Sequence, residues 1–151
     1  MAQTLVTLLV HVVFSTKNRR DLITPDVEAE LFAYMAGVLK KLDSRCLAIN
    51  GTGNHVHLLI AQSKNMALSC LLAELKKSSS KWIKTKGPMF RSFNWQGGYG
   101  AFSIGQSNVE ALKNYIAQQK ARHKKKSFPE EFIEILKKYG IQYDERYIWG
   151  Q

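Results

Sequence analysis

The sequence predicts an α+β fold, in which an antiparallel sheet carries helices on one face and further helices follow towards the C-terminus. The first observation is the order of segments: strand, helix, strand, strand, helix, strand, then helices. That order is the split βαβ plan of ferredoxin-like folds. The second is that 151 residues, 45% of them hydrophobic, suffice for one domain with its own core. The third is that no internal repeat or long linker divides the chain. We therefore expect a single domain over residues 1–151.

The first half of the chain is expected to supply three strands and one helix. Leu5–Ser15 is rich in Leu, Val and Thr, which suits a central strand. Thr24 precedes a proline and can cap an amphipathic helix over Pro25–Leu42. Two short apolar runs, Cys46–Asn50 and His55–Ala61, flank a Gly-Thr-Gly-Asn turn and indicate a hairpin.

The second half begins with a helix and a further hairpin. Asn65 can cap a helix over Met66–Thr85, whose apolar residues recur at helical spacing. Phe93–Trp95 and Tyr99–Ile104 flank a Gly-Gly pair and predict a second hairpin.

The remaining segments are expected to be helical. Ser107 and Glu110 have the spacing of a capping box, which opens a helix over Asn108–Arg122. A short final helix is expected over Pro129–Tyr139, and the tail at 147–149 is expected to pack back on the body.

The charge of the chain indicates a polyanionic partner. Lys and Arg total 22 against 12 acidic residues, a formal net charge of +10. Such a charge favours nucleic acid or an anionic membrane surface, although it also serves general solubility. The apolar opening lacks a basic region and a cleavage site, and it is too short to span a bilayer. With two cysteines that suggest reduced thiols, we expect a cytoplasmic protein without membrane association.

Two histidines on one predicted strand form the first candidate site. Residues i and i+2 of a strand point to the same face, so His55 and His57 can approach one metal ion. Two protein ligands are too few for a structural site and suit an open catalytic one. Taken alone, the pattern is also compatible with histidines that only form hydrogen bonds.

A tyrosine and a glutamine form the second candidate site. Tyr115 and Gln119 are four residues apart on a predicted helix, so they share a face one turn apart. Arg122 continues their row. Alone, a helical tyrosine can equally be a packing residue.

Basic residues supply the third feature. A run of basic residues follows the Tyr115 helix, and others lie near the first strand and on the second helix. Such residues can be solvated, or they can contact phosphates with release of counterions. The predicted nucleic-acid contacts are Arg19, Arg20, Lys77, Lys81, Arg122, Lys124 and Lys125.

Together these features fit one mechanism. Cleavage of a phosphodiester by a tyrosine needs a phenol in line with phosphorus, a Lewis acid on the scissile oxygens and cations along the strand. The chain resembles the HUH single-tyrosine transposases of small bacterial insertion sequences. HUH denotes His, a hydrophobic residue and His, here within Asn-His-Val-His-Leu-Leu-Ile. The resemblance begins at His11–Lys17, includes Phe90–Tyr99, continues through Tyr115–Gln119 and ends near Tyr147.

The resemblance implies a site and a reaction. His55, His57 and Gln119 would bind a divalent ion, Mg²⁺ or Mn²⁺, and Tyr115 would be the nucleophile. Family members are dimers, in which the tyrosine helix of one subunit can complete the other subunit's site. They recognise hairpins in single-stranded DNA and attach to a 5′ phosphate, which frees a 3′-OH. The chain would then be a metal-dependent DNA transposase.

Two alternatives stay open. A repeat-associated tyrosine transposase, acting on chromosomal repeats, would share both motifs. A non-catalytic nucleic-acid-binding domain would use the sheet and its aromatic residues for binding alone. Asn54 is assigned no role, His11 is expected to pack, and His123 is expected to belong to the basic run. Gln118 should point away from the tyrosine's face, because it lies about 100° from Gln119.

Overall fold

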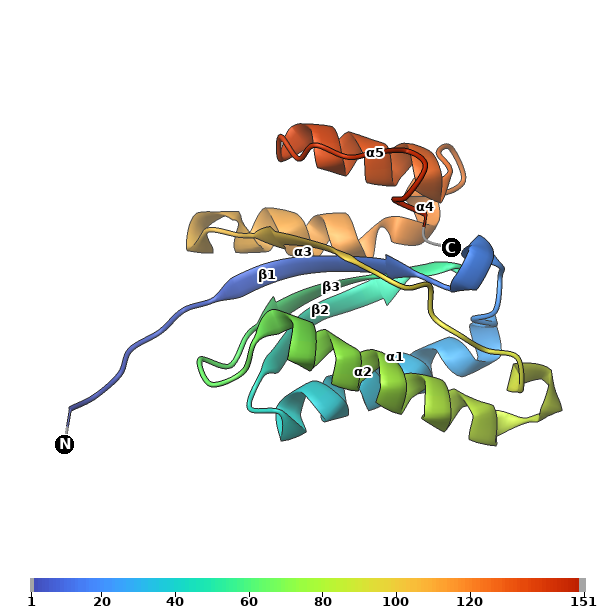
Figure 1. Cartoon of the computed structure of the whole chain (residues 1–151), viewed down its shortest axis with the longest axis horizontal. Coiled ribbons are helices and arrows are strands. Elements are labelled where there is room, and N and C mark those ends of the chain that lie inside the picture. The colour runs from blue at the N-terminus through green and yellow to red at the C-terminus, as the bar shows by residue number, and fades with distance from the viewer. Residues whose placement is uncertain (1, 150–151) are drawn as a thin grey trace.

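The computed structural model describes residues 2–149 and confirms the predicted α+β fold. Four antiparallel strands form one sheet in the order β2-β3-β1-β4 (Figure 1). They are β1 (Leu9–Ser15), β2 (Arg45–Gly51), β3 (His55–Ala61) and β4 (Gly100–Ser103). The central position of β3 and β1 follows from their apolar sequences, which suit strands covered on both faces.

Helices cover the two faces of the sheet in two groups (Figure 1). On one face lie α1 (Pro25–Lys41) and α2 (Leu68–Ile83). On the other lie α3 (Val109–Ala117), α4 (Gln119–Arg122) and α5 (Phe128–Lys138). Short 3-10 turns link these elements: η1 (Lys17–Arg19), η2 (Lys84–Lys86), η3 (Pro88–Phe90) and η4 (Gln106–Asn108).

Strand β3 faces a different environment on each side. Val56, Leu58 and Ile60 point into the main core beneath α1 and α2. His55 and His57, on the opposite face, are fully buried under the C-terminal helices. Because side chains alternate along a strand, the apolar positions anchor β3 in the core and thereby fix the direction of both imidazoles.

The main core lies between the sheet and the first two helices. Burial of each large aliphatic side chain there contributes about 1.5–3 kcal/mol. Its fully buried members include Leu31, Met35, Leu39, Leu58, Ile60, Leu71, Leu72, Leu75 and Ile83. This layer supports the sheet, whose opposite face carries the buried His55 and His57.

Two strand predictions need correction. Leu5–Leu8 lies outside β1, which begins at Leu9 opposite Ala61, although the Leu8 carbonyl still accepts from the Gln62 amide just after β3. The second predicted hairpin is also absent, since β4 pairs with β1. Trp95 forms only an isolated bridge to Thr16, and its indole is buried against α2 with a 2.9 Å hydrogen bond to Ser79. Packing of the aromatic side chain, rather than a Gly-Gly turn, therefore determines the path of this segment.

Predicted N-caps and the span of the Tyr115 helix need correction. Ala67, not Asn65, is the N-cap of α2, and no side chain caps it. The predicted capping box is replaced by η4, which precedes α3 without a side-chain cap. The helix predicted over Asn108–Arg122 is interrupted at Gln118, whose backbone leaves the helical region (φ −99°, ψ 15°).

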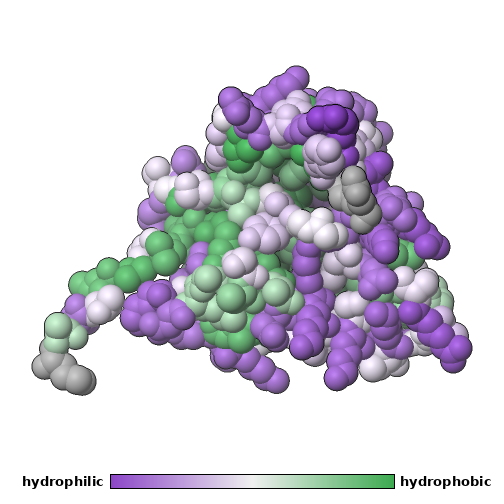
Figure 2. Space-filling view, in the orientation of Figure 1, coloured by the Kyte–Doolittle hydropathy of each residue, from purple (hydrophilic) through white to green (hydrophobic). Residues whose placement is uncertain are grey.

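The surface is polar over the outer sides of the helices and apolar along the N-terminal segment (Figure 2). Leu5, Val6 and Leu8 are exposed there. At the other end, Ile148 and Trp149 pack, as predicted, against a buried cluster that includes Phe128 and Phe132 of α5. Tyr147 is exposed. No helix within residues 2–149 is long and apolar enough to cross a bilayer.

Candidate metal and tyrosine site

His55 is held by the turn that precedes it. Its Nδ1 lies 2.8 Å from Oδ1 of Asn54 and 3.0 Å from the Thr52 hydroxyl. The Asn54 amide nitrogen donates to the Arg19 carbonyl, so its oxygen faces the imidazole. An amide oxygen only accepts, so Nδ1 of His55 carries the proton and Nε2 presents its lone pair.

His57 is held in the same way by a second histidine. Its Nδ1 lies 2.9 Å from Nε2 of His11 on β1. Burial lowers the pKa of His57 to about 4 and that of His11 to about 3, so both rings are neutral near pH 7. When Nδ1 of His57 donates to His11, Nε2 is left free to bind a metal ion.

The side chains of Tyr115 on α3 and Gln119 on α4 extend to the same site as His55 and His57. Gln119 is fully buried, and its Oε1 lies 3.1 Å from Nε2 of His55. Its amide nitrogen donates to Glu131 at 3.0 Å, and the Tyr115 hydroxyl donates to the same carboxylate. Although the helix breaks at Gln118, Tyr115 and Gln119 still contact the same carboxylate, and the Gln118 side chain is exposed.

Glu131 of α5 lies at the centre of the site. It is 2% exposed, and its Oε1 lies 3.1 Å from Nε2 of His57, 3.5 Å from that of His55 and 2.8 Å from that of His123. Burial opposes its ionisation. The three neighbouring imidazoles, His123 first, outweigh that effect and hold the pKa of Glu131 well below its usual range. The carboxyl is therefore charged near pH 7.

The donor set fits a metal ion. With its proton on Nδ1, His55 directs a lone pair at the Gln119 and Glu131 oxygens, which are also acceptors. Positive charge is needed between these atoms, either as a second proton or as a cation. One ligand atom each from His55, His57 and Glu131 lies within 4.8 Å of the others. This buried cluster of nitrogen and oxygen donors could hold a divalent metal ion.

Tyr115 borders a cavity of about 510 Å³ between α3, β4 and α5. Burial, followed by the hydrogen bond to Glu131 and the charge of that carboxylate, raises the pKa of the phenol. The Arg122 guanidinium lies 4.5 Å from the centre of the phenol ring, and its buried Nε has no hydrogen-bond partner among residues 2–149. Arg122 and Tyr115 both line this cavity, so a cation and the candidate nucleophile border the same space.

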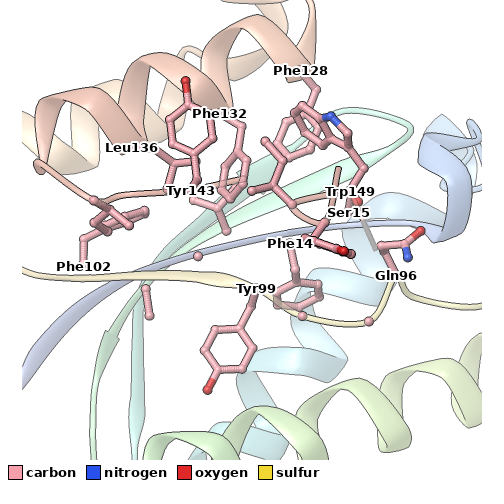
Figure 3. A pocket seen from close by; sticks show the side chains of 18 of the residues that line it. Phe14, Ser15, Gln96, Tyr99, Phe102, Phe128, Phe132, Leu136, Tyr143 and Trp149 are labelled. Atoms are coloured by element: carbon pink, nitrogen blue, oxygen red, sulfur yellow. The ribbon is translucent and has the colours of Figure 1, made fainter. Parts of the chain in front are cut away.

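An aromatic cavity of about 480 Å³ lies on the other side of α5 (Figure 3). Phe128 and Phe132 project into it from α5, with Trp149 from the tail nearby. Phe128 stacks on His55 with ring centres 4.3 Å apart, so the wall of this cavity also supports the metal ligand. Arg19 lies over the Trp149 ring at 4.8 Å.

The predicted nucleic-acid contacts are divided between the two faces of the sheet. Arg122, Lys124 and Lys125 lie at or just after α4, on the site's face, and Arg19 and Arg20 lie at η1 near the His55 turn. Lys77 and Lys81 are exposed on α2, across the sheet from the site (Figure 1). Their contact with the strand bound at the site would require DNA that passes around the molecule.

Sequence reasoning missed three partners and misplaced a fourth. Glu131 was given no role, although it stands on the apolar stripe of its helix, three residues after Phe128 and four before Ile135. A carboxylate at such a position was the available signal. His123 was assigned to the basic run, but its side chain is 10% exposed and points at Glu131. Asn54 and His11 orient the two metal-ligand candidates, which spacing alone does not reveal.

The chain belongs to a known family. The family model described as "Transposase IS200 like" matches residues 4–119, so the chain is a member of the IS200-like transposase family. That match includes His55, His57, Tyr115 and Gln119 and ends before α5. No curated protein sequence matches the chain.

Two solved structures have a similar fold. One is a candidate transposase from Deinococcus radiodurans R1, with 18% identity and a TM-score of 0.62 over 79% of this chain and 95% of that chain. The other is a REP-associated tyrosine transposase bound to a REP hairpin, with 14% identity and a TM-score of 0.59 over 82% of this chain and 73% of that chain. At these identities the likeness shows a shared fold alone.

Proposed function

We propose that this chain is a metal-dependent transposase that cleaves and rejoins single-stranded DNA through a covalent bond to Tyr115. One observation carries the proposal: Tyr115 and Gln119 converge with His55 and His57 from separate elements, around the carboxylate of Glu131. Family membership supports it.

The residues would divide the reaction between them. His55, His57 and Gln119 would hold Mg²⁺ or Mn²⁺, which supplies Lewis-acid polarisation of the scissile phosphate when bound. The Tyr115 oxygen would form a bond to phosphorus while the bond to the 3′ oxygen breaks, leaving a 5′-phosphotyrosine and a free 3′-OH. Attack by a 3′-OH on that linkage would restore a phosphodiester without a nucleotide cofactor.

The partners would be DNA with hairpins and a second copy of the chain. A structural neighbour is bound to a REP hairpin, which supports hairpin recognition here. The exposed apolar segment with Leu5, Val6 and Leu8 offers a surface that a second subunit could cover. A second candidate function is action on chromosomal repeats in place of an element's own ends, and the REP-associated neighbour supports it.

An adduct assay tests the proposal. The protein is incubated with Mn²⁺ and a set of hairpin-containing single strands from the DNA around its gene, and the attached residue is mapped. We expect an adduct on Tyr115 that requires metal and disappears in Tyr115→Phe. Tyr139→Phe, which removes a hydroxyl from the same cavity, should keep it. Binding without cleavage of any strand would instead favour a non-catalytic domain.

A further inference from the structure

Glu131 presents its two oxygens to two different sets of partners. Oε1 faces the Nε2 atoms of His55, His57 and His123. Oε2 faces the Tyr115 hydroxyl and the Gln119 amide. One carboxylate thus lies between the imidazoles that would hold a metal ion and the phenol that would attack.

On these contacts we propose that Glu131 is a bridging carboxylate, which binds the metal ion through one oxygen and orients the Tyr115 hydroxyl through the other. The inference deepens the proposed function and rests on it. It adds α5, which lies outside the region matched by the family model, to the active site.

The burial of this carboxylate supports the assignment. A buried charge is costly unless it is compensated. Within residues 2–149, histidines are the only basic side chains within 4.0 Å of Glu131. Nε2 of His55, whose Nδ1 donates to Asn54, faces the carboxylate as a second acceptor at 3.5 Å. A divalent ion next to Oε1 would supply positive charge between these two acceptors.

The packing of α5 supports a positioning role. Ser127 caps the helix by accepting from the Glu130 amide, and Phe128 stacks on His55. Phe132, one residue after Glu131, packs so close to β4 that a Cβ on Gly100 would lie 2.8 Å from its ring. These contacts fix the helix on both sides of Glu131, so the carboxylate is held rigidly between metal and phenol.

Two DNA-free measurements test the two halves of the bridge. Solvent-proton relaxation counts the waters bound directly to Mn²⁺ at saturating metal, and ¹³C NMR of ring-labelled tyrosine follows the Tyr115 Cζ atom, assigned with Tyr115→Phe. Glu131→Ala is expected to add about one water to the ion and to weaken Mn²⁺ binding roughly 10–100-fold. It should also move the Tyr115 resonance.

Glu134→Gln is the matched control, because Glu134 lies on the same helix, lines the same cavity and is 58% exposed. It should leave both readouts as in the wild type. Glu131→Met keeps the length of the side chain without an oxygen ligand and repeats the test if the alanine variant unfolds. An unchanged water count overturns the ligand role, because a residue that only supports the ligands would not open a coordination position. An unmoved Tyr115 resonance overturns the orienting role.

The outcome is separable from the proposed function. If Tyr115→Phe still forms a DNA adduct, Tyr115 is not the nucleophile. The water count and the NMR shift still report whether the Glu131 carboxylate contacts both the metal ion and the phenol. If the adduct depends on Tyr115 while Glu131→Ala leaves both readouts unchanged, the bridge fails and the proposed function stands.

Discussion

Nε2 of His11 lies 2.9 Å from Nδ1 of His57, with both rings buried and stacked 5.2 Å apart. This contact joins β1 to β3 directly behind the cluster that could hold a metal ion. A histidine that accepts the distal proton of a metal-binding imidazole fixes its tautomer and raises its basicity.

Substitution of His11 should therefore weaken metal binding although His11 itself is not a proposed ligand. We expect His11→Phe to reduce Mn²⁺ affinity about 10-fold in titration calorimetry. The phenyl ring keeps the contacts with Phe102 and Tyr115. Unchanged affinity would mean that His57 keeps its tautomer without this partner.

The stability of the metal-free protein should fall with pH below the ordinary histidine range. The pKa values of His11 and His57 in the folded state, about 3 and about 4, lie below the unfolded value of 6.5. The unfolded chain therefore takes up these protons first, so the stability present above pH 6.5 is lost as the pH falls.

Urea unfolding with a chelator present measures this loss. Between about pH 6.5 and pH 4.5 each histidine should remove up to about 1.4 kcal/mol per pH unit from the free energy of unfolding. His11→Phe should show a shallower slope than the wild type. A free energy of unfolding that stays constant across this window would contradict the buried neutral state of both rings.

The sequence predicts those parts of the site that lie within one element. The spacing of His55 and His57 on a strand, and of Tyr115 and Gln119 on a helix, follows from backbone periodicity. The apolar segment of β1 likewise predicts a central strand. The apolar stripe around Glu131 indicates a buried carboxylate, but its partners depend on how α5 packs across the sheet, which no local pattern encodes. His123 was misassigned for the same reason: its neighbours in sequence are lysines, whereas its neighbours in space are His55 and Glu131.

Arg122 is expected to affect chemistry more than binding. Its guanidinium lies over the Tyr115 ring, and its buried Nε has no partner in the described part of the chain, so it can meet the charge that develops on a phosphate beside the phenol. We expect Arg122→Ala to slow adduct formation about 10²-fold. Arg122→Lys should be slow as well, because an ammonium cannot reproduce the planar stacked geometry.

Lys125→Ala provides the comparison for Arg122, since Lys125 is exposed in the same basic run. It should lower DNA affinity with little effect on the rate at saturating DNA. Equal effects of the two variants on the single-turnover rate would show that Arg122 acts only as part of the basic surface.

Gly100 and Gly37 should respond in opposite directions to the same substitution. A Cβ at Gly100 would lie 2.8 Å from the Phe132 ring. A Cβ at Gly37, in the middle of α1, would have no atom from outside its own helix turn within 4 Å among the described residues. Gly100→Ala should cost about 1–3 kcal/mol through overpacking. Gly37→Ala should add about 0.5–1 kcal/mol, because alanine loses less backbone entropy in a helix.

Thermal or urea unfolding measures both glycine variants. Because Phe132 neighbours Glu131, Gly100→Ala should also weaken Mn²⁺ binding, and Gly37→Ala should not. Full metal affinity in a destabilised Gly100→Ala protein would show that the position of α5 is not coupled to the site.

The salt dependence of DNA binding can decide which face of the sheet carries the strand. Lys124 and Lys125 follow α4 beside the site, whereas Lys77 and Lys81 lie on α2 across the sheet. For a single strand, each phosphate contact contributes about 0.7 to the slope of log affinity against log salt concentration. We expect replacement of Lys124 and Lys125 by Gln to reduce the slope by roughly 1.4, and the same change at Lys77 and Lys81 to leave it nearly unchanged.

Fluorescence anisotropy with a labelled single strand at several salt concentrations gives both slopes. A larger reduction from the α2 pair would place the DNA around the first two helices, and the strand at Tyr115 would then have to continue across the edge of the sheet.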